Sequence, residues 1–481
     1  MFLKHQQLPQ FWSKRIKISS GSLCKLQFFK CFTTNNKNNY TADEMNHLCK
    51  EYTMFSWSAQ AKVAPIAMSK AKGCFFWDTS GKKYFDMNSQ LMCSNIGHGH
   101  PKVIQAIKDQ AEELAFAGPN FSTRVRAEIG PKLAQYMPGD LKKFFFTLGG
   151  SEANENAIKF AKFFTKRNKL IARHRSYHGA TQGSVSLTGD PRRWPNEPSL
   201  PGVIRIFDPF KYRSLKYREG MTDEEFSALM LEELEETLMY ENPESVAAIF
   251  IETVTGSNGI IPPPQGYLEG LRKICDKYGI LMVCDEVMCG LGRTGEWFAV
   301  DHWKVVPDII TMAKGLTCGY LPLGAVAVSE KIAKEFENRV FSGGLTYQSH
   351  PMCLAAACAV LDVLKEEKVI ENCKKMGKVL DYNMRLMKEN HRCVGDVRSI
   401  GLFGAIELVK DRKTKEPMAP YGGTSEVIGK VMGYLKEQGI FAYAFGHMIH
   451  TNPPLVVNEQ ELNEAFKAID GALSIADEYC N

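Results

Sequence analysis

The sequence predicts an α/β fold: a large domain with a mostly parallel sheet covered by helices, plus a smaller α+β domain. Between about residues 142 and 328, short apolar runs typical of buried strands alternate with segments of helical spacing. This βαβ rhythm indicates a parallel sheet with both faces covered. With 481 residues, the chain is long enough for two domains. No apolar run approaches the roughly 18–20 residues that a membrane-spanning helix needs, so no membrane span is expected.

Before the parallel sheet, the sequence predicts one hairpin and one amphipathic helix. The hairpin covers residues 74–86, with Asp78-Thr-Ser-Gly81 at its turn. The helix covers residues 101–117, because apolar side chains recur there at helical spacing.

Within and after the sheet region, the elements follow from short apolar runs and longer amphipathic segments. Strands are predicted at 144–147, 170–172, 246–251, in the run that ends at Asp285 and in the run before Lys314. Helices are predicted from Ser151, over 215–242, around 267–277 and over 352–366, and a short strand at 404–409. The expected domains are a leader over 1–42, a segment over 43–95 that contributes to the small domain, the large domain over 96–350, and a connecting helix with the C-terminal small domain over 351–481.

The formal net charge of +5 comes from the start of the chain. Residues 1–42 contain seven Lys or Arg and no Asp or Glu, and without these seven charges the remainder is at −2. A near-neutral body gives no reason to expect nucleic-acid binding. The basic, acid-free start is typical of a mitochondrial transit peptide and predicts the mitochondrial matrix. The alternative is an Asn-rich tail without a targeting role, which would leave the protein in the cytoplasm.

Two polar residues that follow buried strands are the first candidates for chemistry. Asp285 ends one apolar run, and Lys314 follows the next. Because the carboxyl ends of parallel strands meet at one edge of a sheet, where open α/β sheets bind ligands, both side chains are expected to face one crevice. Pyridoxal phosphate chemistry needs such a pair, since an amine holds the aldehyde covalently and a carboxylate keeps the ring nitrogen protonated.

A phosphate site is predicted where Leu148-Gly-Gly-Ser-Glu-Ala-Asn154 follows a strand and opens a helix. The two glycines let the backbone approach an anion closely, Ser151 is a good N-cap, and the helix dipole favours a phosphate. Tyr177, in a loop after the 170–172 strand, is placed to stack on a pyridine ring, with Val287 against the opposite ring face. The alternative for both residues is ordinary packing against the core.

Other patterns give no site. Gly290-Leu-Gly-Arg-Thr-Gly295 matches a dinucleotide-binding fingerprint, but no helical pattern follows it and the next strand leads to a lysine instead of an acid. Gly97-His-Gly-His-Pro101 offers two histidines without a third ligand, so no metal is expected. The 14 cysteines are scattered without a C-x-x-C pair, which favours a reducing compartment.

Together these residues resemble the class III (ω-type) pyridoxal-phosphate aminotransferases of fold type I. The resemblance runs from about Trp57 to Ala476. Its motifs, in fixed order, are 149–154, 176–179, 285–287, 292–295, 313–315, 344–347 with His350-Pro351, and 453–455. Within the family, residues 57–60, 89–91 and 186–194 look most like the branch that includes taurine:2-oxoglutarate aminotransferases.

The resemblance implies a role for each matching residue. Lys314 would hold the cofactor and then move the proton between the substrate Cα and the cofactor C4′, while Asp285 would pair with the pyridinium. Tyr177 and Val287 would sandwich the ring. The other cofactor-binding residues would be Gly150 and Ser151 at the phosphate, His178, Glu252 near the cofactor O3′, and Thr346, which would reach the phosphate of the neighbouring subunit in a homodimer. Trp57 and Tyr84 are candidate walls of the substrate pocket.

One departure from the family pattern concerns substrate choice. The family commonly has an arginine shortly before the Pro453-Pro454 motif that binds the carboxylate of the oxo acid, but this chain has no arginine after Arg412. Histidine or methionine cannot copy a bidentate guanidinium. Arg398, Arg192 or Arg193 takes that role, or the choice of acceptor differs. The usual Thr-Tyr-Ser-Gly-His-Pro is here Thr346-Tyr-Gln-Ser-His-Pro351, which perturbs the loop that would reach the neighbouring subunit.

The predicted function is ping-pong transamination between an amine donor, such as taurine, β-alanine or another ω-amine or an amino acid, and a 2-oxo acid. Two alternatives stay open from the sequence. The first is an aminomutase or decarboxylase that uses the same cofactor, because fold does not fix chemistry. The second is a catalytically idle paralogue that serves as a structural subunit of a mitochondrial assembly, an alternative favoured only by the missing arginine.

Overall fold

The computed structural model describes residues 40–481. Residues 1–39, most of the predicted leader, lie outside the described residues, so the transit peptide stays a prediction. The chain divides into two compact units, Met1–Ala67 and Met68–Asn481. In the first unit, Thr41 and Glu44 form a capping box at the start of α1 (Ala42–Tyr52), and η1 (Gln60–Lys62) is a 3₁₀ turn. The predicted boundaries after residues 42, 95 and 350 stay predictions.

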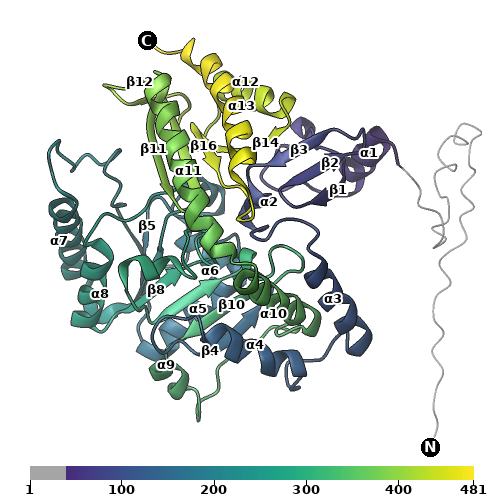
Figure 1. The fold of residues 1–481 in the computed structure, drawn as a ribbon. Helices are drawn as coiled ribbons and strands as arrows, with labels where there is room; N and C mark the ends of the chain where they lie inside the picture. The colour runs from purple at the N-terminus through teal and green to yellow at the C-terminus, as the bar shows by residue number, and fades with distance from the viewer. Residues whose placement is uncertain (1–39) are drawn as a thin grey trace, which may run out of the picture. The chain divides into compact units, whose positions relative to one another are not determined.

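The largest sheet of the second unit has seven strands in the order β4-β10-β9-β8-β7-β5-β6 (Figure 1). Every neighbouring pair is parallel except the two that involve β10. The predicted mostly parallel sheet is therefore confirmed. Its strands are β4 (Lys143–Thr147), β5 (Lys169–Arg173), β6 (Val203–Ile206), β7 (Val246–Glu252), β8 (Leu281–Asp285), β9 (Ile309–Met312) and β10 (Gly324–Val328).

Both faces of this sheet are covered because its strands send alternate side chains into two hydrophobic cores. In β8, Leu281 and Val283 belong to one core, and Met282 and Cys284 belong to the other. Figure 1 shows α7 and α8 side by side. The core that contains Leu281 and Val283 includes side chains of α5 (Gly150–Thr165), α6 (Gln182–Leu187) and α9 (Glu330–Glu335). The core that contains Met282 and Cys284 includes side chains of α4 (Arg124–Ala134), α7 (Asp223–Glu241), α8 (Tyr267–Tyr278) and α10 (Pro351–Glu366).

Two smaller sheets complete the second unit. The predicted hairpin is confirmed as β2 (Phe75–Asp78) and β3 (Lys83–Asp86), which share a sheet with β1 (Met68–Lys72) and, from the far end of the chain, β14 (Ile440–Phe441). The other sheet runs β11-β12-β16-β15, with β13 paired to β12. Its strands are β11 (Val394–Ile400), β12 (Phe403–Asp411), β13 (Glu416–Pro417), β15 (Tyr443–Phe445) and β16 (Met448–Thr451).

The remaining elements connect these sheets or cover them. α11 (Val369–Asn390) and α13 (Glu459–Asp477) contact each other, and α13 also contacts α12 (Glu426–Glu437). α3 (Pro101–Glu113) contacts α10. The short elements are α2 (Ser89–Met92), η2 (Pro191–Asn196), η3 (Pro243–Ser245), η4 (Ala299–Trp303) and η5 (Lys314–Leu316).

Three predicted helix boundaries were wrong. The helix expected over 215–242 begins only at Asp223, because Thr222 caps it and its side chain accepts a hydrogen bond from the Glu225 N–H. The helix expected over 101–117 ends at Glu113, where the following Leu114 turns to extended backbone. The helix expected from Ser151 begins at Gly150.

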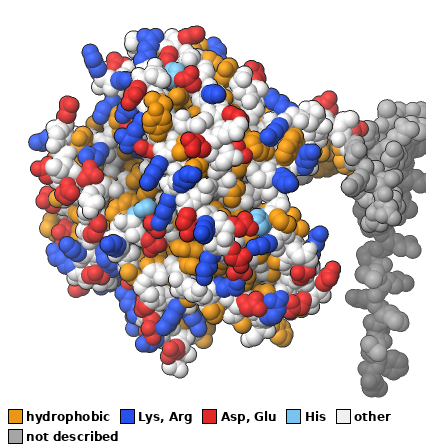
Figure 2. Space-filling model, viewed as in Figure 1, with side chains coloured by type: hydrophobic (Ala, Val, Ile, Leu, Met, Phe, Trp, Pro, Cys, Tyr) orange, Lys and Arg blue, Asp and Glu red, His pale blue; other side chains and the backbone are white. Residues whose placement is uncertain are grey.

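On the face drawn in Figure 2, neither sign of charge predominates. On the face drawn in Figure 2, Lys and Arg side chains are interspersed with Asp and Glu side chains over the described residues. This distribution agrees with the near-neutral charge of residues 43–481. Within residues 40–481, no helix combines the length and the apolar character that crossing a bilayer requires.

Candidate active site

The predicted acid and amine lie at one edge of the seven-stranded sheet. Asp285 is the last residue of β8, and Lys314 follows β9, the parallel neighbour of β8, by two residues. A second acid, Glu252, ends β7 and lies beside Asp285 in register. Because three adjacent parallel strands end here, their polar residues converge at the carboxyl edge, where open α/β sheets bind ligands.

Asp285 is buried and fixed by three hydrogen-bond donors. The His178 Nδ1 lies 2.8 Å from Asp285 Oδ2, and the Asn154 side-chain amide donates to the same oxygen at 2.8 Å. The Val287 N–H donates to Oδ1 at 3.0 Å. These contacts orient the carboxylate, while the Nε2 of His178 has no hydrogen-bond partner among the described residues. A carboxylate held this firmly suits a constant negative charge beside a cationic ring.

Asn154 is a site residue that the sequence did not single out. Its amide donates both to Asp285 and to the His178 carbonyl oxygen at 2.7 Å, and its Oδ1 accepts from the Thr311 hydroxyl at 2.9 Å. Asn154 thus links α5, the 177–179 loop and β9. The available signal was a polar amide in the otherwise apolar, sheet-facing stripe of α5, since buried polar side chains need partners.

Lys314 occupies an unusual backbone position at the start of η5. Its φ is +39°, in the left-handed region that non-glycine residues avoid, and its side chain is half-buried. Burial lowers the pKa of the Lys314 amine, although Cys93, Asp285 and Glu252 oppose that shift electrostatically. A lowered pKa favours the neutral amine, which is the form that attacks an aldehyde and accepts a proton.

Glu252 is buried with fewer compensating contacts than Asp285. The Tyr177 N–H donates to Oε1 at 3.0 Å and the Gly256 N–H donates to Oε2 at 2.8 Å. Burial raises the pKa of Glu252 to about 7, with Asp285 adding to the rise and His178 opposing it. A carboxyl group poised near neutral pH is characteristic of functional sites.

The phosphate site predicted at the start of α5 stays a prediction, and its Gly150 packs closely against a neighbouring side chain. A Cβ on Gly150 would come within 3.0 Å of Val287 Cγ1, so only glycine leaves this space open. Ser151 is not the N-cap as predicted. Gly149 caps the helix, and the Ser151 hydroxyl instead accepts a hydrogen bond from the Ala180 N–H at 3.1 Å. The first-turn N–H groups and the helix dipole still favour an anion.

Tyr177 is half-buried in the loop after β5, and a guanidinium group packs against one face of its ring. The Arg192 Cζ lies 3.7 Å from the Tyr177 ring centroid, which is a cation–π contact. Arg192 is also close enough to Lys314 to affect the pKa of its amine. The predicted sandwich of a pyridine ring between Tyr177 and Val287 stays a prediction.

The structure does not bring every predicted residue into this group. The ring of Tyr84 stacks on Phe76 at 5.0 Å and its hydroxyl bonds to Asp78, so Tyr84 belongs to the small β1–β3 sheet. Thr346 is exposed between α9 and α10. Trp57 belongs to the first unit, so its predicted place in the substrate pocket stays a prediction.

Arg398 is held by the protein itself. Its NH1 pairs with Asp396 at 2.7 Å and with Glu407 at 2.8 Å, and its Nε donates to the Gly259 carbonyl oxygen at 2.9 Å. Arg193 pairs with Glu197. Both guanidinium groups are therefore engaged by acids of the chain, unlike the free carboxylate clamp that the sequence suggested for Arg398.

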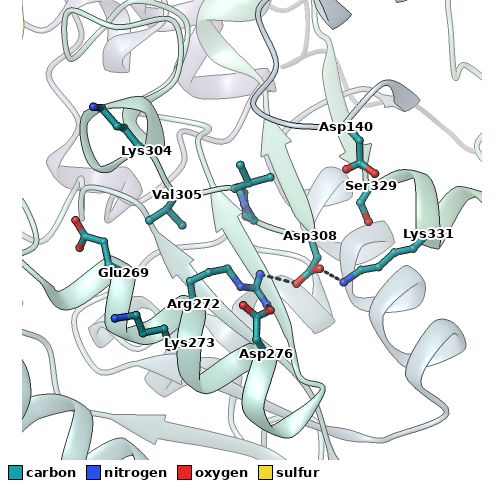
Figure 3. Close-up of a pocket in the computed structure, with 12 residues that line it drawn as sticks. Asp140, Glu269, Arg272, Lys273, Asp276, Lys304, Val305, Asp308, Ser329 and Lys331 are labelled. Atoms are coloured by element: carbon teal, nitrogen blue, oxygen red, sulfur yellow. Dashed lines mark hydrogen bonds and ion pairs between the residues drawn. The ribbon is translucent and has the colours of Figure 1, made fainter.

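The cavity in Figure 3 lies at the other edge of the sheet and is not part of this group. It has a volume of about 520 Å³ and includes Asp308, which precedes β9. Figure 3 shows Asp308 between Arg272 and Lys331, with ion pairs to both. Its cations are interspersed with acids, so it shows no preference for one sign of ligand. No group of His, Cys, Asp or Glu suited to a metal occurs in residues 40–481.

The site residues fit pyridoxal phosphate on three counts. The first-turn N–H groups of α5 suit the phosphate, the oriented Asp285 suits a protonated ring nitrogen, and Lys314 supplies an amine of lowered pKa.

Comparison with known proteins agrees with this geometry. A family model described as aminotransferase class-III matches residues 57–473. A crystal structure of taurine:2-oxoglutarate aminotransferase from Bifidobacterium kashiwanohense, in complex with pyridoxal phosphate and glutamate, is 41% identical. It superposes with a TM-score of 0.89, over 92% of this chain and 99% of that chain.

Two curated relatives are also similar over most of their length. Taurine–pyruvate aminotransferase of Bilophila wadsworthia is 32% identical over 460 residues, which is 91% of this chain and 99% of the relative. Putrescine–pyruvate aminotransferase of Pseudomonas aeruginosa is 34% identical over 412 residues, which is 82% of this chain and 88% of the relative.

Proposed function

Because the chain belongs to the class-III aminotransferases and is a pyridoxal-phosphate enzyme of fold type I, we propose that its amine donors carry an acid group remote from the amine, as taurine and β-alanine do. The enzyme transfers an amino group between an amine and a 2-oxo acid. The family assignment favours this reaction over the aminomutase, decarboxylase and idle-subunit alternatives.

The residues of the chain divide the chemistry among them. When bound, pyridoxal phosphate supplies an aldehyde and a ring that withdraws electrons from the breaking Cα–H bond. Asp285 supplies the negative charge for the ring nitrogen, and the N-terminus of α5 supplies N–H donors for the phosphate. Lys314, whose amine has a lowered pKa, holds the cofactor and accepts or returns the substrate proton.

Arg192 is the best-placed residue for the acid group of a substrate. Of the three arginines that the sequence left open, Arg398 is held by two acids, while Arg193 and Arg192 each pair with one, Glu197 and Asp190. Arg192 lies against Tyr177, in the electrostatic neighbourhood of Lys314, and its side chain is 19% exposed. An arginine is suited to a carboxylate or sulfonate because its planar fork donates two parallel hydrogen bonds.

The proposal rests on one observation, namely which nitrogens of the Arg192 guanidinium already have hydrogen-bond partners. Asp190 engages its Nε and NH2. Its NH1 has no hydrogen-bond partner among the described residues. One edge of the fork is thus fixed by the protein, and the other is available to an acidic ligand. Two of the similar proteins described above are named for taurine, a sulfonate, which supports this choice.

A donor screen tests the proposed substrate class. The purified enzyme with bound cofactor is mixed with taurine, β-alanine or putrescine, and the absorption change of the cofactor is followed in single half-reactions. We expect taurine or β-alanine to react with a higher kcat/KM than putrescine, which lacks an acid group. Arg192→Gln should lower kcat/KM for the acidic donors by at least about tenfold, since a charge-assisted hydrogen bond is lost, and should spare putrescine. Preference for putrescine, or equal losses for all donors in the variant, would contradict the proposal.

A homodimer with shared active sites is also part of the proposal. Thr346 is exposed in the segment between α9 and α10, next to Tyr347, and Phe121, Tyr347 and Phe116 are exposed by 66%, 54% and 43%. Exposed aromatic side chains in one region are typical of protein interfaces. The partner copy would then supply Thr346 to the phosphate end of the site.

Mixing two inactive variants tests this arrangement. Lys314→Ala and Thr346→Asp are each expected to be inactive, the second through repulsion of the cofactor phosphate. After mixed refolding, a heterodimer contains one site with both changes and one site with neither, so activity should return toward about a quarter of the wild-type value. No recovery, in mixtures shown by light scattering to be dimeric, would place Thr346 outside the partner's site.

The mitochondrial matrix completes the proposal and rests on composition alone. Residues 1–42 combine seven basic residues with no acidic residue. A fluorescent protein fused behind residues 1–42 is expected to enter mitochondria. A fusion in which the seven basic residues are changed to Gln should stay outside, and entry of both fusions would argue against a charge-dependent transit peptide.

A further inference from the structure

A chain of hydrogen bonds leads from the C-terminal lobe to the acid-binding arginine. The Tyr421 hydroxyl donates to Asn258 Oδ1 at 3.1 Å, and the Asn258 amide donates to Asp190 Oδ2 at 3.1 Å. Asp190 in turn accepts from the backbone N–H of Arg192 at 3.0 Å and from its Nε at 3.1 Å. Four side chains from three separate parts of the sequence therefore form one connected path.

The middle of this path is closed to water. Asp190 and Asn258 are both 0% exposed, so neither can exchange its protein partner for a water molecule. Inside the protein, hydrogen bonds of a connected network strengthen one another, and leaving one member unpaired is costly. The position of Asp190 is thus tied to Asn258, and the position of Asn258 to Tyr421.

The far end of the path is anchored on the loop between β13 and α12. Tyr421 is 36% exposed, and the Arg175 Cζ lies 5.0 Å from its ring centroid. The next residue, Gly422, has φ +70°, and a Cβ there would lie 2.2 Å from Pro191 Cγ. The loop therefore packs directly against the residue between Asp190 and Arg192, which gives it a second route to the same segment.

We propose that Tyr421 and Asn258 are positioning residues that set substrate acid recognition by holding Asp190, and through it Arg192, in the receptive orientation. This inference rests on the proposed role of Arg192. With both Asp190 oxygens occupied, the carboxylate cannot rotate, and the Nε–NH2 edge of Arg192 stays engaged while NH1 is left for the ligand. Without the Asn258 and Tyr421 contacts, Asp190 can turn and the long arginine side chain regains alternative rotamers.

The expected signature is a loss of affinity restricted to acidic substrates. Arg192 acts on the acid group and not on the reacting amine, so a displaced guanidinium raises KM for taurine or 2-oxoglutarate and leaves the proton-transfer rate unchanged. A donor without an acid group, such as putrescine, should show no change. A general structural defect would affect all donors and the unfolding transition alike.

Steady-state kinetics of two variants of the holoenzyme test the inference. Tyr421→Phe removes only the hydroxyl, and we expect KM for acidic substrates to rise about two- to tenfold, the range produced by loss of one neutral hydrogen bond, at unchanged kcat. Asn258→Ala breaks the path at its buried centre, and the rise should exceed that of Tyr421→Phe. Tyr479→Phe is the matched control, because it removes a hydroxyl that contacts Lys430 in the same lobe and lies off the path.

A double-variant comparison separates this inference from the proposed function. If Tyr421 acts through Arg192, adding Tyr421→Phe to Arg192→Gln should cause no further rise in KM for acidic substrates. An additive rise, or an unchanged KM in both Tyr421→Phe and Asn258→Ala, would overturn the positioning role while leaving the role of Arg192 intact. If Arg192→Gln itself leaves KM for acidic substrates unchanged, the proposed acid site fails first, and the positioning role falls with it.

Discussion

Two buried groups of charged side chains in this chain differ in how completely they are neutralised. At the sheet edge, Glu252, Asp285 and Lys314 lie near one another, and two acids face one amine. In the C-terminal lobe, Glu407 is surrounded by Arg398, Arg213 and His447. The acids of both groups are buried, and yet the pKa of Glu252 is raised while that of Glu407 is lowered.

The lobe cluster is complete without a ligand. The Glu407 carboxylate accepts from Arg213 Nε at 2.6 Å and forms an ion pair with Arg398 NH1 at 2.8 Å, and His447 Nε2 lies at 3.2 Å. Burial by itself would raise the pKa of Glu407, but the two arginines and the histidine hold it far below its usual range. This cluster joins strands of the C-terminal lobe to residues 213 and 259 of the rest of the unit.

In the group at the sheet edge, by contrast, the buried acids are not fully paired with cations. Burial raises the pKa of Glu252 to about 7, and within residues 40–481 no arginine pairs with its carboxylate. A group that the protein buries without full compensation is reserved for a ligand or a proton, whereas a fully paired group serves the fold. The contrast also explains the roles assigned to two arginines. Arg398, which is held by acids of the chain, stabilises the fold, whereas Arg192, with one free edge, is available to bind the acid group of a substrate.

Replacing Lys314 tests the site cluster and should have the largest effect. Lys314→Ala removes the amine that holds the cofactor and moves the proton, so the rate of amino transfer should fall by at least about a thousandfold. The unfolding midpoint of the cofactor-free protein should change little, because the half-buried side chain leaves no large cavity. Reduction of the holoenzyme with borohydride, followed by peptide mapping, should label the wild-type peptide that contains residue 314 and leave the variant unlabelled. Label at the same yield in both proteins would mean that another lysine holds the cofactor.

Replacing Arg398 tests the lobe cluster, where the effect should fall on stability. Arg398→Ala removes a buried cation that pairs with both Asp396 and Glu407, and this costs up to about 3–5 kcal/mol, because Glu407 keeps Arg213 and His447. Urea denaturation of the holoenzyme measures this loss. Arg192→Gln is the matched comparison and should cost less than Arg398→Ala, because Asp190 keeps its hydrogen bonds from Asn258 and from the backbone N–H of residue 192. Equal losses in the two variants would remove the distinction drawn between the clusters.

The unfolding free energy should depend on pH in opposite directions for Glu252 and Glu407, which allows a direct comparison of the two groups. Glu252 has a folded pKa of about 7 against an ordinary value of 4.5, so the folded state keeps a proton that the unfolded state releases between these values. Unfolding free energy therefore falls as pH rises from 4.5 to 7, by up to about 3 kcal/mol. Glu252→Gln should lose this contribution when urea unfolding is compared at pH 5 and pH 8, while Glu286, whose pKa burial also raises to about 7, keeps its own.

Glu407, in the C-terminal lobe, should give the opposite pH dependence of the unfolding free energy and serves as the control. The folded pKa of Glu407 is lowered, so its contribution is present above pH 4.5 and is lost as pH falls below that value. Glu407→Gln should therefore keep the part of the decline between pH 5 and pH 8 that Glu252→Gln lacks. The same slope in wild type and Glu252→Gln would show that Glu252 does not titrate in this range.

The parts of the site that lie at strand ends could be predicted from sequence. Asp285, Glu252 and Lys314 each follow an apolar run, and parallel pairing alone brings the ends of such runs together. The hairpin was predictable from its local turn sequence. Each of these inferences needs only local patterns and one rule of topology.

Pairings between distant segments could not be predicted in this way. Nothing in the residues around Arg398 shows that Glu407 and the Gly259 carbonyl would engage its guanidinium, or that Asn258 would reach Asp190 across 68 positions. Ser151 is of a residue type that favours the N-cap, yet Gly149 is the N-cap and the helix begins at Gly150. A side chain's chemical type was visible in the sequence, but its partner was not.

The pairing of β3 with β14 has a consequence for how the chain is made. Lys82, just before β3, bonds to the carbonyl oxygen of Glu437, 355 residues away. At about 5–20 residues per second of synthesis, on the order of 20–70 seconds therefore pass between the synthesis of β3 and that of β14. During this time one edge of β3 has no paired strand. An unpaired strand edge invites pairing with other chains, so we expect newly translated protein to depend on chaperones that shield this hairpin until the last tenth of the polypeptide arrives.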